Sequence, residues 1–146
     1  MIYLVDIDGT LADLSHRLHF IEKEPKDWDG FFAACGGDAP IPKVINTVKS
    51  LERNNEILLV TGRTEDVRQQ TEDWLLAKGI SWDAMYMRQS GDHRPDNIVK
   101  GELLDQILDT YCDQDDIAGV FEDRKQVVDM YRARGLQVYQ VAEGNF

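Results

Sequence analysis

The sequence predicts an α/β fold in which helices cover both faces of a parallel sheet. Short, continuously apolar runs recur along the 146-residue chain and alternate with segments of helical periodicity. Continuous apolar runs are typical of strands that are buried on both faces, as the strands of a parallel sheet are. Glycine and asparagine stand between many of these segments and predict turns. The chain length is that of one domain, so we expect residues 1–146 to fold as a single unit.

The first elements follow directly from this pattern. Residues 2–5 are an apolar run and are expected to form the first strand. Apolar residues at helical spacing predict a helix at residues 44–51, which Asn54 and Asn55 can end. A second apolar run at residues 57–60 then predicts the next strand of the sheet.

The second half of the chain repeats the alternation. Thr64 is expected to cap a helix that Gly79 closes, and residues 84–87 are expected to form the following strand. Pro95 is expected at the first position of a helix whose apolar stripe extends to Tyr111. The remaining predicted elements are a strand at residues 117–121, a helix that Gly135 ends, and a last strand at residues 137–141. Strands and amphipathic helices that alternate in this way favour a parallel sheet covered on both faces.

Residues 13–40 are the exception to this alternation, since they show no clear period. A segment of this length between the first strand and the first helix is usually functional, and we interpret it as a small lid or cap. Its aromatic residues Trp28, Phe31 and Phe32 leave a second interpretation open. They can instead form one face of a short helix that packs on the core.

The composition limits the classes of function. The formal net charge of -11 disfavours broad binding to a polynucleotide backbone, although a few Arg and Lys side chains can still capture one phosphate. No apolar run approaches the roughly 18 residues of a membrane span, and no basic stretch precedes an apolar one at the N-terminus. Cys35 and Cys112 are expected to be reduced thiols used in packing. We therefore expect a cytoplasmic protein without membrane contact, and nothing in the sequence indicates a stable protein partner.

The first predicted strand runs directly into the motif Asp6-Ile7-Asp8-Gly9-Thr10. Alternation places Asp6 and Asp8 on one side of an extended segment, and two like charges so close require a cation or a proton. Gly9 provides a tight turn at which backbone N–H groups can approach an anion, and Thr10 adds a hydroxyl group. The motif therefore predicts a pocket for phosphate and Mg²⁺.

Two alternatives to a phosphate pocket arise from the same residues. Asp8-Gly9 is a common hairpin signal, so a plain turn stays open as an interpretation. A calcium-binding EF-hand loop is excluded, because the positions that require glycine and glutamate hold Leu11 and Arg17. Residues elsewhere in the chain must therefore decide between a turn and a site.

Polar residues also follow two other predicted strands. In an open parallel sheet, ligands bind outside the carboxyl ends of the strands, so these residues are expected to lie near the first motif. Thr61, Gly62 and Arg63 offer a hydroxyl and a guanidinium group for phosphate oxygens, with a turn and a polar cap as the alternative. Glu122 and Asp123 form a second acidic pair that can help to complete a Mg²⁺ site, with an ordinary helix cap as the alternative.

Lys100 lies one turn into its predicted helix, with Asp96 four residues earlier on the same face. Taken alone, an exposed ion pair is the simpler interpretation of these two residues. Polar residues suited to a phosphate site therefore occur in four places at one edge of the predicted sheet. Such a combination is much less expected by chance than any one of the four. We therefore interpret Lys100 as part of the same site.

The three histidines give weaker signals. His16 and His19 are three residues apart, but they lack a Cys partner and the predicted site is rich in carboxylates, which disfavours zinc. His93 is expected to be a solvated loop residue, with contact to a substrate as the alternative.

The strand followed by Asp-x-Asp-Gly-Thr resembles the first motif of the haloacid dehalogenase (HAD) superfamily. The other motifs of that superfamily correspond here to Thr61, to Lys100, and to Glu122 with Asp123. The resemblance implies a Rossmann-like fold and a phosphatase in which Asp6 is the nucleophile and forms an aspartyl-phosphate. It also implies Asp8 as the general acid and base, a role for which we expect a raised pKa.

The same resemblance implies the cofactor Mg²⁺ and its ligands. The ion would bind the Asp6 carboxylate, the backbone carbonyl of Asp8 and Asp123, with Glu122 reaching it directly or through water. Thr61, Lys100 and the Gly9 backbone would stabilise charge on the phosphoryl oxygens.

Three further blocks resemble the 3′-phosphatase domain of bacteriophage-type polynucleotide kinase. They are residues 88–96 with Val99-Lys100, residues 124–131, and residues 140–146, and Arg17 after the first motif is similar too. The resemblance implies polynucleotide 3′-phosphatase activity, with Arg17, Arg63 and Asp96 as supporting pocket residues. Arg88 and Arg94 are expected to contact the part of the substrate remote from the reacting phosphate.

The chain departs from the kinase-phosphatase pattern in two respects, the lack of a kinase motif and the acidic segment at residues 13–40, and two alternative functions stay open. No Gly-x-x-x-x-Gly-Lys-Ser/Thr motif occurs, so we expect no kinase activity. A phosphatase for free nucleotides or other small phosphomonoesters would account better for the acidic surface. A catalytically silent regulator that binds phosphate is the other alternative, and the presence of Asp8 argues against it.

Overall fold

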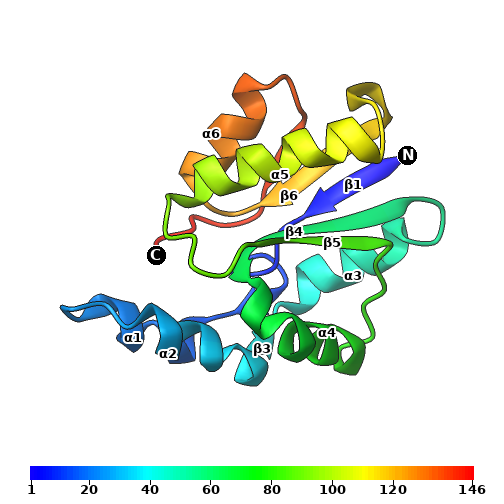
Figure 1. Cartoon of the computed structure of the whole chain (residues 1–146). Helices are drawn as coiled ribbons and strands as arrows, with labels where there is room; N and C mark the ends of the chain where they lie inside the picture. Colours follow the sequence, from blue (N-terminus) through cyan, green and yellow to red (C-terminus); the bar gives the residue numbers. More distant parts are fainter.

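A computed structural model describes all 146 residues of the chain. Its centre is a five-stranded sheet in the order β5-β4-β1-β6-β7. The strands are β1 (Ile2–Val5), β4 (Glu56–Thr64), β5 (Ala84–Arg88), β6 (Ile117–Glu122) and β7 (Val138–Gln140). All four pairings are parallel, and the carboxyl ends therefore lie at one edge of the sheet (Figure 1).

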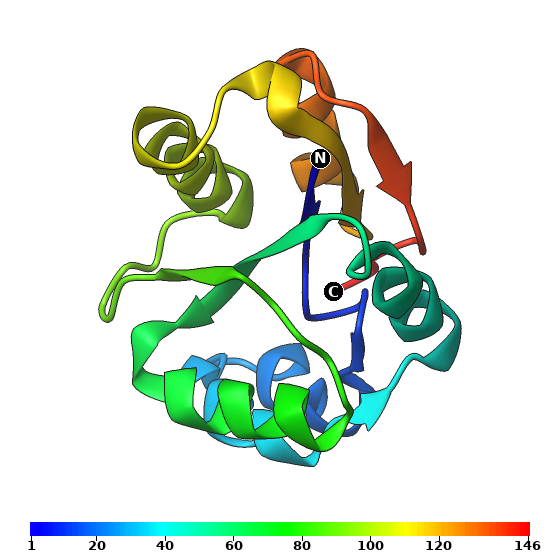
Figure 2. The same ribbon diagram turned by 90° about the vertical axis from the view of Figure 1, so that its right-hand side faces the viewer.

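Helices cover both faces of this sheet, as the sequence predicts. The helices α3 (Pro42–Leu51) and α4 (Arg68–Ala77) lie on one face, and α5 (Asp96–Thr110) and α6 (Lys125–Ala133) lie on the other (Figures 1 and 2). Successive side chains of β1 point to opposite faces. Leu4 accordingly packs in the cluster under α5 and α6, and Val5 packs in the cluster under α3 and α4. Both side chains are fully buried, so the central strand is covered on both sides.

The structure confirms every predicted strand and helix of the α/β body, but three local details differ. The strand β4 is longer than expected, so Thr61, Gly62 and Arg63 lie in its last residues instead of in a turn. The register against β5 shifts between Thr61 and Thr64, which marks an irregularity at the point where the site begins. Pro95 has an extended backbone (φ -54°, ψ 148°) and precedes α5 by one residue instead of occupying its first position.

The ends of two helices also differ from the sequence prediction. Thr64 makes no capping hydrogen bond with its side chain, and one 3-10 turn, η3 (Glu65–Val67), precedes α4. At the end of α3, the Asn55 amide donates to the Leu51 carbonyl at 3.0 Å. Asn55 therefore helps to end this helix through its side chain, without a left-handed backbone.

Residues 13–40, which we call the cap segment, extend from the body at the carboxyl edge of the sheet (Figure 1). The short antiparallel strands β2 (Ala12–Asp13) and β3 (Ala39–Pro40) join the segment to the body. Between them lie η1 (Ser15–Arg17), α1 (His19–Glu22), α2 (Trp28–Ala33) and η2 (Cys35–Gly37). The Trp74 indole of α4 donates to the Asp38 carbonyl at 2.8 Å and so ties the segment to the body.

The aromatic residues of the cap segment do lie on a short helix, α2, but they pack mostly within the segment. Phe31 is buried in a small cluster with Leu14 and Ile21, separate from the two main clusters. Phe32 contacts both this cluster and the core under α3 and α4, whereas Trp28 is 38% exposed. The cap segment therefore has a small hydrophobic core of its own.

Two sequence expectations concern cysteines and membranes. Cys35 and Cys112 are both free thiols, and Cys35 is buried in the main core.

No helix has the length and the apolar content that crossing a bilayer requires.

Leu4→Ala tests the burial of the central strand. It should lower the free energy of unfolding by about 2–5 kcal/mol, because it leaves a cavity between β1 and the helices that cover it. The matched control is Leu76→Ala on α4, whose side chain is 66% exposed and whose effect should stay within about 0.5 kcal/mol. Urea unfolding followed by circular dichroism measures both changes, and equal losses would contradict the burial of Leu4.

Candidate active site

Asp6 lies immediately after β1, where its backbone N–H continues the sheet by donating to the Phe121 carbonyl at 3.0 Å. One carboxylate oxygen, Oδ1, accepts from Lys100 Nζ at 2.8 Å, and the other accepts from Thr10 Oγ1 at 3.0 Å. Burial and the neighbouring Glu122 carboxylate raise the pKa of Asp6 well above its ordinary value, although Lys100 opposes them. The nucleophile expected from the sequence is therefore held in one orientation from both of its oxygens.

Asp6, Glu122 and Asp123 form one acidic cluster, in which carboxylate oxygens lie within 4.8 Å of one another. All three residues are buried, and Asp123 Oδ2 has no hydrogen-bond partner. Gly9, with φ +82°, lies against that oxygen, and a Cβ atom at this position would collide with it. Burial raises the pKa of Glu122 to about 7. A buried carboxylate oxygen without a partner is unfavourable, so the cluster fits a divalent cation that prefers oxygen ligands.

Lys100 is fully buried on α5 and is not the exposed ion pair of the alternative interpretation. Its Nζ atom contacts Asp6 Oδ1 at 2.8 Å and Glu122 Oε2 at 2.7 Å. Asp96 lies farther away, with Oδ2 at 3.6 Å from the same atom. Burial alone would lower the pKa of Lys100, but Asp6, Asp96 and Glu122 outweigh burial and hold it well above its ordinary value. Lys100 therefore brings a positive charge directly beside the Asp6 carboxylate.

Asp8 is held by two buried arginines on a single oxygen. Its Oδ1 accepts from Arg17 Nη2 at 2.6 Å and from Arg63 Nη2 and Nε at 2.7 and 3.1 Å. Burial raises the pKa of Asp8, but Arg63 and Arg17 outweigh burial and lower it to about 2. The raised pKa expected from the sequence is therefore wrong for this arrangement, because spacing along the chain does not reveal that both guanidinium groups converge on Asp8.

Asp38 completes this network, and the sequence analysis missed it. Its two carboxylate oxygens accept from Arg17 Nε and Nη2 at 2.8 and 2.7 Å, and Oδ2 also accepts from Arg63 Nη2 at 3.0 Å. The side chains of Arg17, Arg63 and Asp38 are fully buried. Two guanidinium groups thus face two carboxylates, those of Asp8 and Asp38. The sequence carries no signal for Asp38, because the need for its charge follows from the burial of Arg17 and Arg63 beside Asp8, which the structure shows.

Arg88 lies at the cavity wall and organises the loop between β5 and α5. Its Nε donates to the Gly62 carbonyl at 2.8 Å, and Nη1 donates to the carbonyls of Asp92 and Arg94 at 3.2 and 2.7 Å. Its Nη2 donates to Asp96 Oδ1 at 3.1 Å. Gly62 leaves room for this arrangement, because a Cβ atom there would collide with Asp96 Oδ1.

Arg94 also lines the cavity, but acidic side chains already engage it. Its guanidinium group pairs with Asp92 and Glu102 at 2.9 and 2.5 Å, and its side chain is about half exposed. Arg124, which the sequence analysis did not place in the site, lines the cavity as well. Its one ion pair is the long contact of Nη1 to Asp96 Oδ2 at 3.7 Å.

Several predicted residues lie behind the cavity wall. Thr61 is fully buried, and its Oγ1 accepts from the Arg63 backbone N–H at 3.1 Å. Arg17 and Arg63 do not line the cavity either, so only Arg88 and Arg94 of the four predicted arginines do. The backbone N–H of Gly9 donates to the Ala12 carbonyl at 2.8 Å and is thereby engaged within the turn.

His16 and His19 do not share a metal site. His16 Nε2 lies 2.7 Å from Asp38 Oδ1, whereas the His19 ring stacks on Phe20 with centroids 4.2 Å apart.

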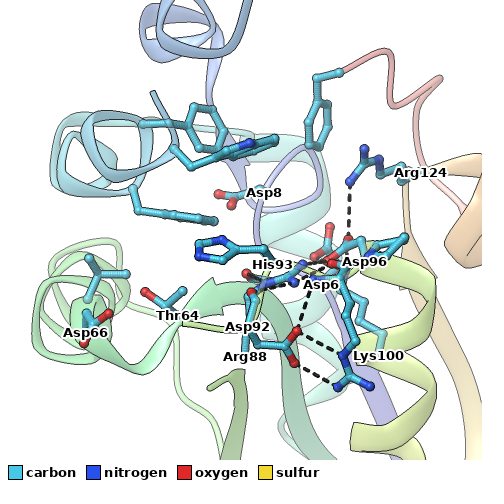
Figure 3. A pocket seen from close by; sticks show the side chains of 18 of the residues that line it. Asp6, Asp8, Thr64, Asp66, Arg88, Asp92, His93, Asp96, Lys100 and Arg124 are labelled. Carbon is cyan, nitrogen blue, oxygen red and sulfur yellow. Dashed lines mark hydrogen bonds and ion pairs between the residues drawn. The ribbon is translucent and has the colours of Figure 1, made fainter. Parts of the chain in front are cut away.

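The cavity has a volume of about 700 Å³ and opens at the carboxyl edge of the sheet. Asp6, Asp8 and Lys100 line it from the body, as Figure 3 shows. Side chains of α2 and of the loop at residues 91–95 line it from other sides. A cavity of this size can hold a ligand as large as a nucleotide.

Asp38→Asn tests the buried charge network. We expect a loss of about 3–5 kcal/mol in the free energy of unfolding, because two buried guanidinium groups would then share one carboxylate. The control is Asp109→Asn on α5, an exposed aspartate whose replacement should change stability by less than about 0.5 kcal/mol. Urea unfolding measures both variants, and a loss at Asp38 no larger than at Asp109 would contradict the network.

Comparison with known proteins identifies the family to which this site belongs. The family model described as the polynucleotide kinase PNKP phosphatase domain matches residues 1–146. Two chains from structures of a Pnkp1/Rnl/Hen1 RNA repair complex are 29% and 30% identical to this chain, with TM-scores of 0.81 and 0.80. Each alignment covers 99% of this chain. It covers only 43% and 47% of the two longer chains, respectively.

More distant structures share the fold. A class C acid phosphatase from Bacillus anthracis with tungstate bound is 15% identical, with a TM-score of 0.68 over 99% of this chain and 67% of its own. A haloacid dehalogenase-like hydrolase from Streptococcus pneumoniae, SP0104, is 17% identical, with a TM-score of 0.65 over 95% of this chain and 83% of its own. The chain therefore belongs to the polynucleotide kinase phosphatase-domain family within the haloacid dehalogenase phosphatases.

Proposed function

We propose that this phosphatase removes the 3′-phosphate from a polynucleotide end through an aspartyl-phosphate on Asp6. One observation carries the proposal: Lys100 and Thr10 fix the Asp6 carboxylate in a cavity, next to the partnerless carboxylate oxygen of Asp123. Membership in the polynucleotide kinase phosphatase-domain family supports the choice of substrate.

The acidic cluster fits Mg²⁺, the cofactor expected from the sequence, and phosphatases of this superfamily generally use a divalent metal. Asp6 and Asp123 would hold the ion, with Glu122 as a direct or water-mediated ligand and the backbone carbonyl of Asp8 as a further one. When bound, Mg²⁺ supplies positive charge that offsets the carboxylates and the phosphoryl group.

In the first half of the reaction, an oxygen of Asp6 forms a bond to phosphorus while the bond from phosphorus to the sugar oxygen breaks. Lys100, 2.8 Å from Asp6 Oδ1, places its charge where the phosphoryl oxygens gain negative charge. The departing sugar oxygen is an alkoxide and requires a proton. Asp8 is the acidic side chain of the cavity that we assign to this transfer.

The protonation of Asp8 therefore changes during the reaction. With a pKa of about 2, Asp8 is ionised at neutral pH, which suits the second half, where a base takes a proton from the attacking water. A phosphate dianion in the cavity opposes the two arginines, because a like charge disfavours the ionised form of Asp8. Substrate binding thus raises the pKa of Asp8 and makes the protonated form, which the first half requires, easier to reach.

A phosphatase for mononucleotides or other small phosphomonoesters is the second candidate function. More carboxylates than cationic groups line the cavity, and the chain has a net charge of -11, which disfavours contact with many backbone phosphates. A catalytically silent regulator that binds phosphate is the third candidate. Such a protein would not need a second carboxylate, that of Asp8, in the cavity with Asp6.

A panel of substrates with and without Mg²⁺ separates these candidates. The panel contains oligonucleotides with a 3′- or a 5′-phosphate and free mononucleotides, and phosphate release is measured. We expect the 3′-phosphorylated oligonucleotide to have the highest kcat/KM, and a chelator to abolish turnover until Mg²⁺ is restored. Faster hydrolysis of mononucleotides would favour the second candidate, and full activity with the chelator would contradict the metal site.

Stopped-flow hydrolysis of an aryl phosphate tests the two aspartates separately. Asp6→Asn should give neither a burst nor turnover, because the covalent intermediate cannot form. Asp8→Asn should release one aryl alcohol per site and then turn over roughly 10²–10⁴-fold more slowly, since an aryl leaving group needs no proton but the second half needs the base. Asp109→Asn is the control and should behave as the unmodified protein. A burst in Asp6→Asn would place the nucleophile elsewhere.

A further inference from the structure

His93 presents an imidazole to the cavity and has no partner for it. The side chain is exposed, lines the cavity, and takes part in no hydrogen bond or ion pair. Figure 3 shows the ring projecting into the cavity from its loop. The sequence analysis left contact with a substrate open as the alternative for this residue.

The backbone around His93 is fixed on both sides, although the side chain is free. Arg88 Nη1 donates to the carbonyls of Asp92 and Arg94, the two neighbours of His93 in the chain. Asp92 Oδ1 also accepts from the Arg94 backbone N–H at 3.1 Å. The loop therefore positions the backbone of His93, so that a ligand has to order only the imidazole side chain and not the loop.

Aromatic side chains of α2 line the same cavity from the cap segment. Trp28 is 38% exposed, and its ring stacks on Phe32 with centroids 6.1 Å apart and an interplanar angle of 28°. Exposed aromatic rings in a cavity are the surfaces on which nucleobases stack. Lys26 Nζ also lies over the Trp28 ring, 5.9 Å from its centroid. The exposed part of Trp28 that lines the cavity can thus receive a planar ring.

The residues that line the cavity lie on two sides of it. Lys100, Asp96 and Arg124 lie on one side of Figure 3, and His93, Thr64 and Asp66 lie on the other. The carboxylates of Asp29, Asp66 and Asp92 also line the cavity, whereas acidic groups and carbonyls already engage Arg88 and Arg94. A backbone phosphate would be repelled there. A neutral base would not be repelled, and its amino groups can donate to carboxylates.

We propose that His93 and Trp28 form the binding site for the nucleobase of the terminal nucleotide, whose phosphate reaches Asp6. This inference rests on the proposed function, since it requires a nucleotide substrate. Both side chains contact the base and make the enzyme discriminate a nucleotide from a base-free sugar phosphate. His93 is the specificity-determining residue that the loop at residues 91–95 contributes.

A matched pair of substrates tests the site. One is an oligonucleotide with a 3′-phosphate on an ordinary terminal nucleotide, and the other carries an abasic sugar at the same position. The unmodified protein should prefer the first by roughly tenfold in kcat/KM, within the range expected for one stacked base. His93→Ala and Trp28→Ala should reduce this ratio to near one. His19→Ala, which removes a histidine outside the cavity, should keep the ratio.

A binding measurement separates failure of this site from failure of the proposed function. In the Asp6→Asn background, adenosine 3′-phosphate should quench tryptophan fluorescence, and Trp28→Phe in the same background should lose that signal. Quenching by the nucleotide without hydrolysis of any 3′-phosphorylated substrate would overturn the proposed function and support the base site. Equal hydrolysis of the base-bearing and abasic substrates by the unmodified protein would overturn the base site and leave the 3′-phosphatase function standing.

Discussion

The buried pairing of Arg17 and Arg63 with Asp8 and Asp38 is the interaction on which the rest of the site depends. Arg17 and Asp38 belong to the cap segment, whereas Asp8 and Arg63 belong to the body, so the four charges join the two parts. Removing one member of a buried ion network is costly, because the others cannot regain their hydration. The cap segment is therefore fixed over the cavity by the same groups that set the protonation of Asp8.

The sequence was sufficient to predict the residues that leave the strands at the carboxyl edge. Asp6, Glu122 and Asp123 converge because the parallel strands β1 and β6 are adjacent. The fold class predicts that these residues lie at the same edge of the sheet, and the structure adds the order of the strands. Lys100 reaches Asp6 from α5. The helical spacing predicted only its neighbour Asp96, whereas the resemblance to the superfamily motifs predicted its place in the site. These positions depend on the backbone path, and the periodicity of apolar residues determines that path closely.

Features that depend on long side chains were not predictable in the same way. Arg63 lies at the expected strand, but its guanidinium group extends behind the cavity wall to Asp8. Asp38 is one of many acidic residues in the chain, and no period or spacing distinguishes it. The pKa of Asp8 then depends on both contacts, so its direction could be known only once the side chains were placed.

The hydrogen bonds of Arg88 also affect how the ligand preference of this site can change during evolution. A single guanidinium group connects the carbonyl of Gly62 on β4, the loop carbonyls of Asp92 and Arg94, and the Asp96 carboxylate at the start of α5. None of these bonds uses the side chain at position 93. Evolution can therefore exchange the residue at position 93, and with it the ligands that are favoured, without rebuilding the loop or disturbing Lys100 and Asp6 beneath it.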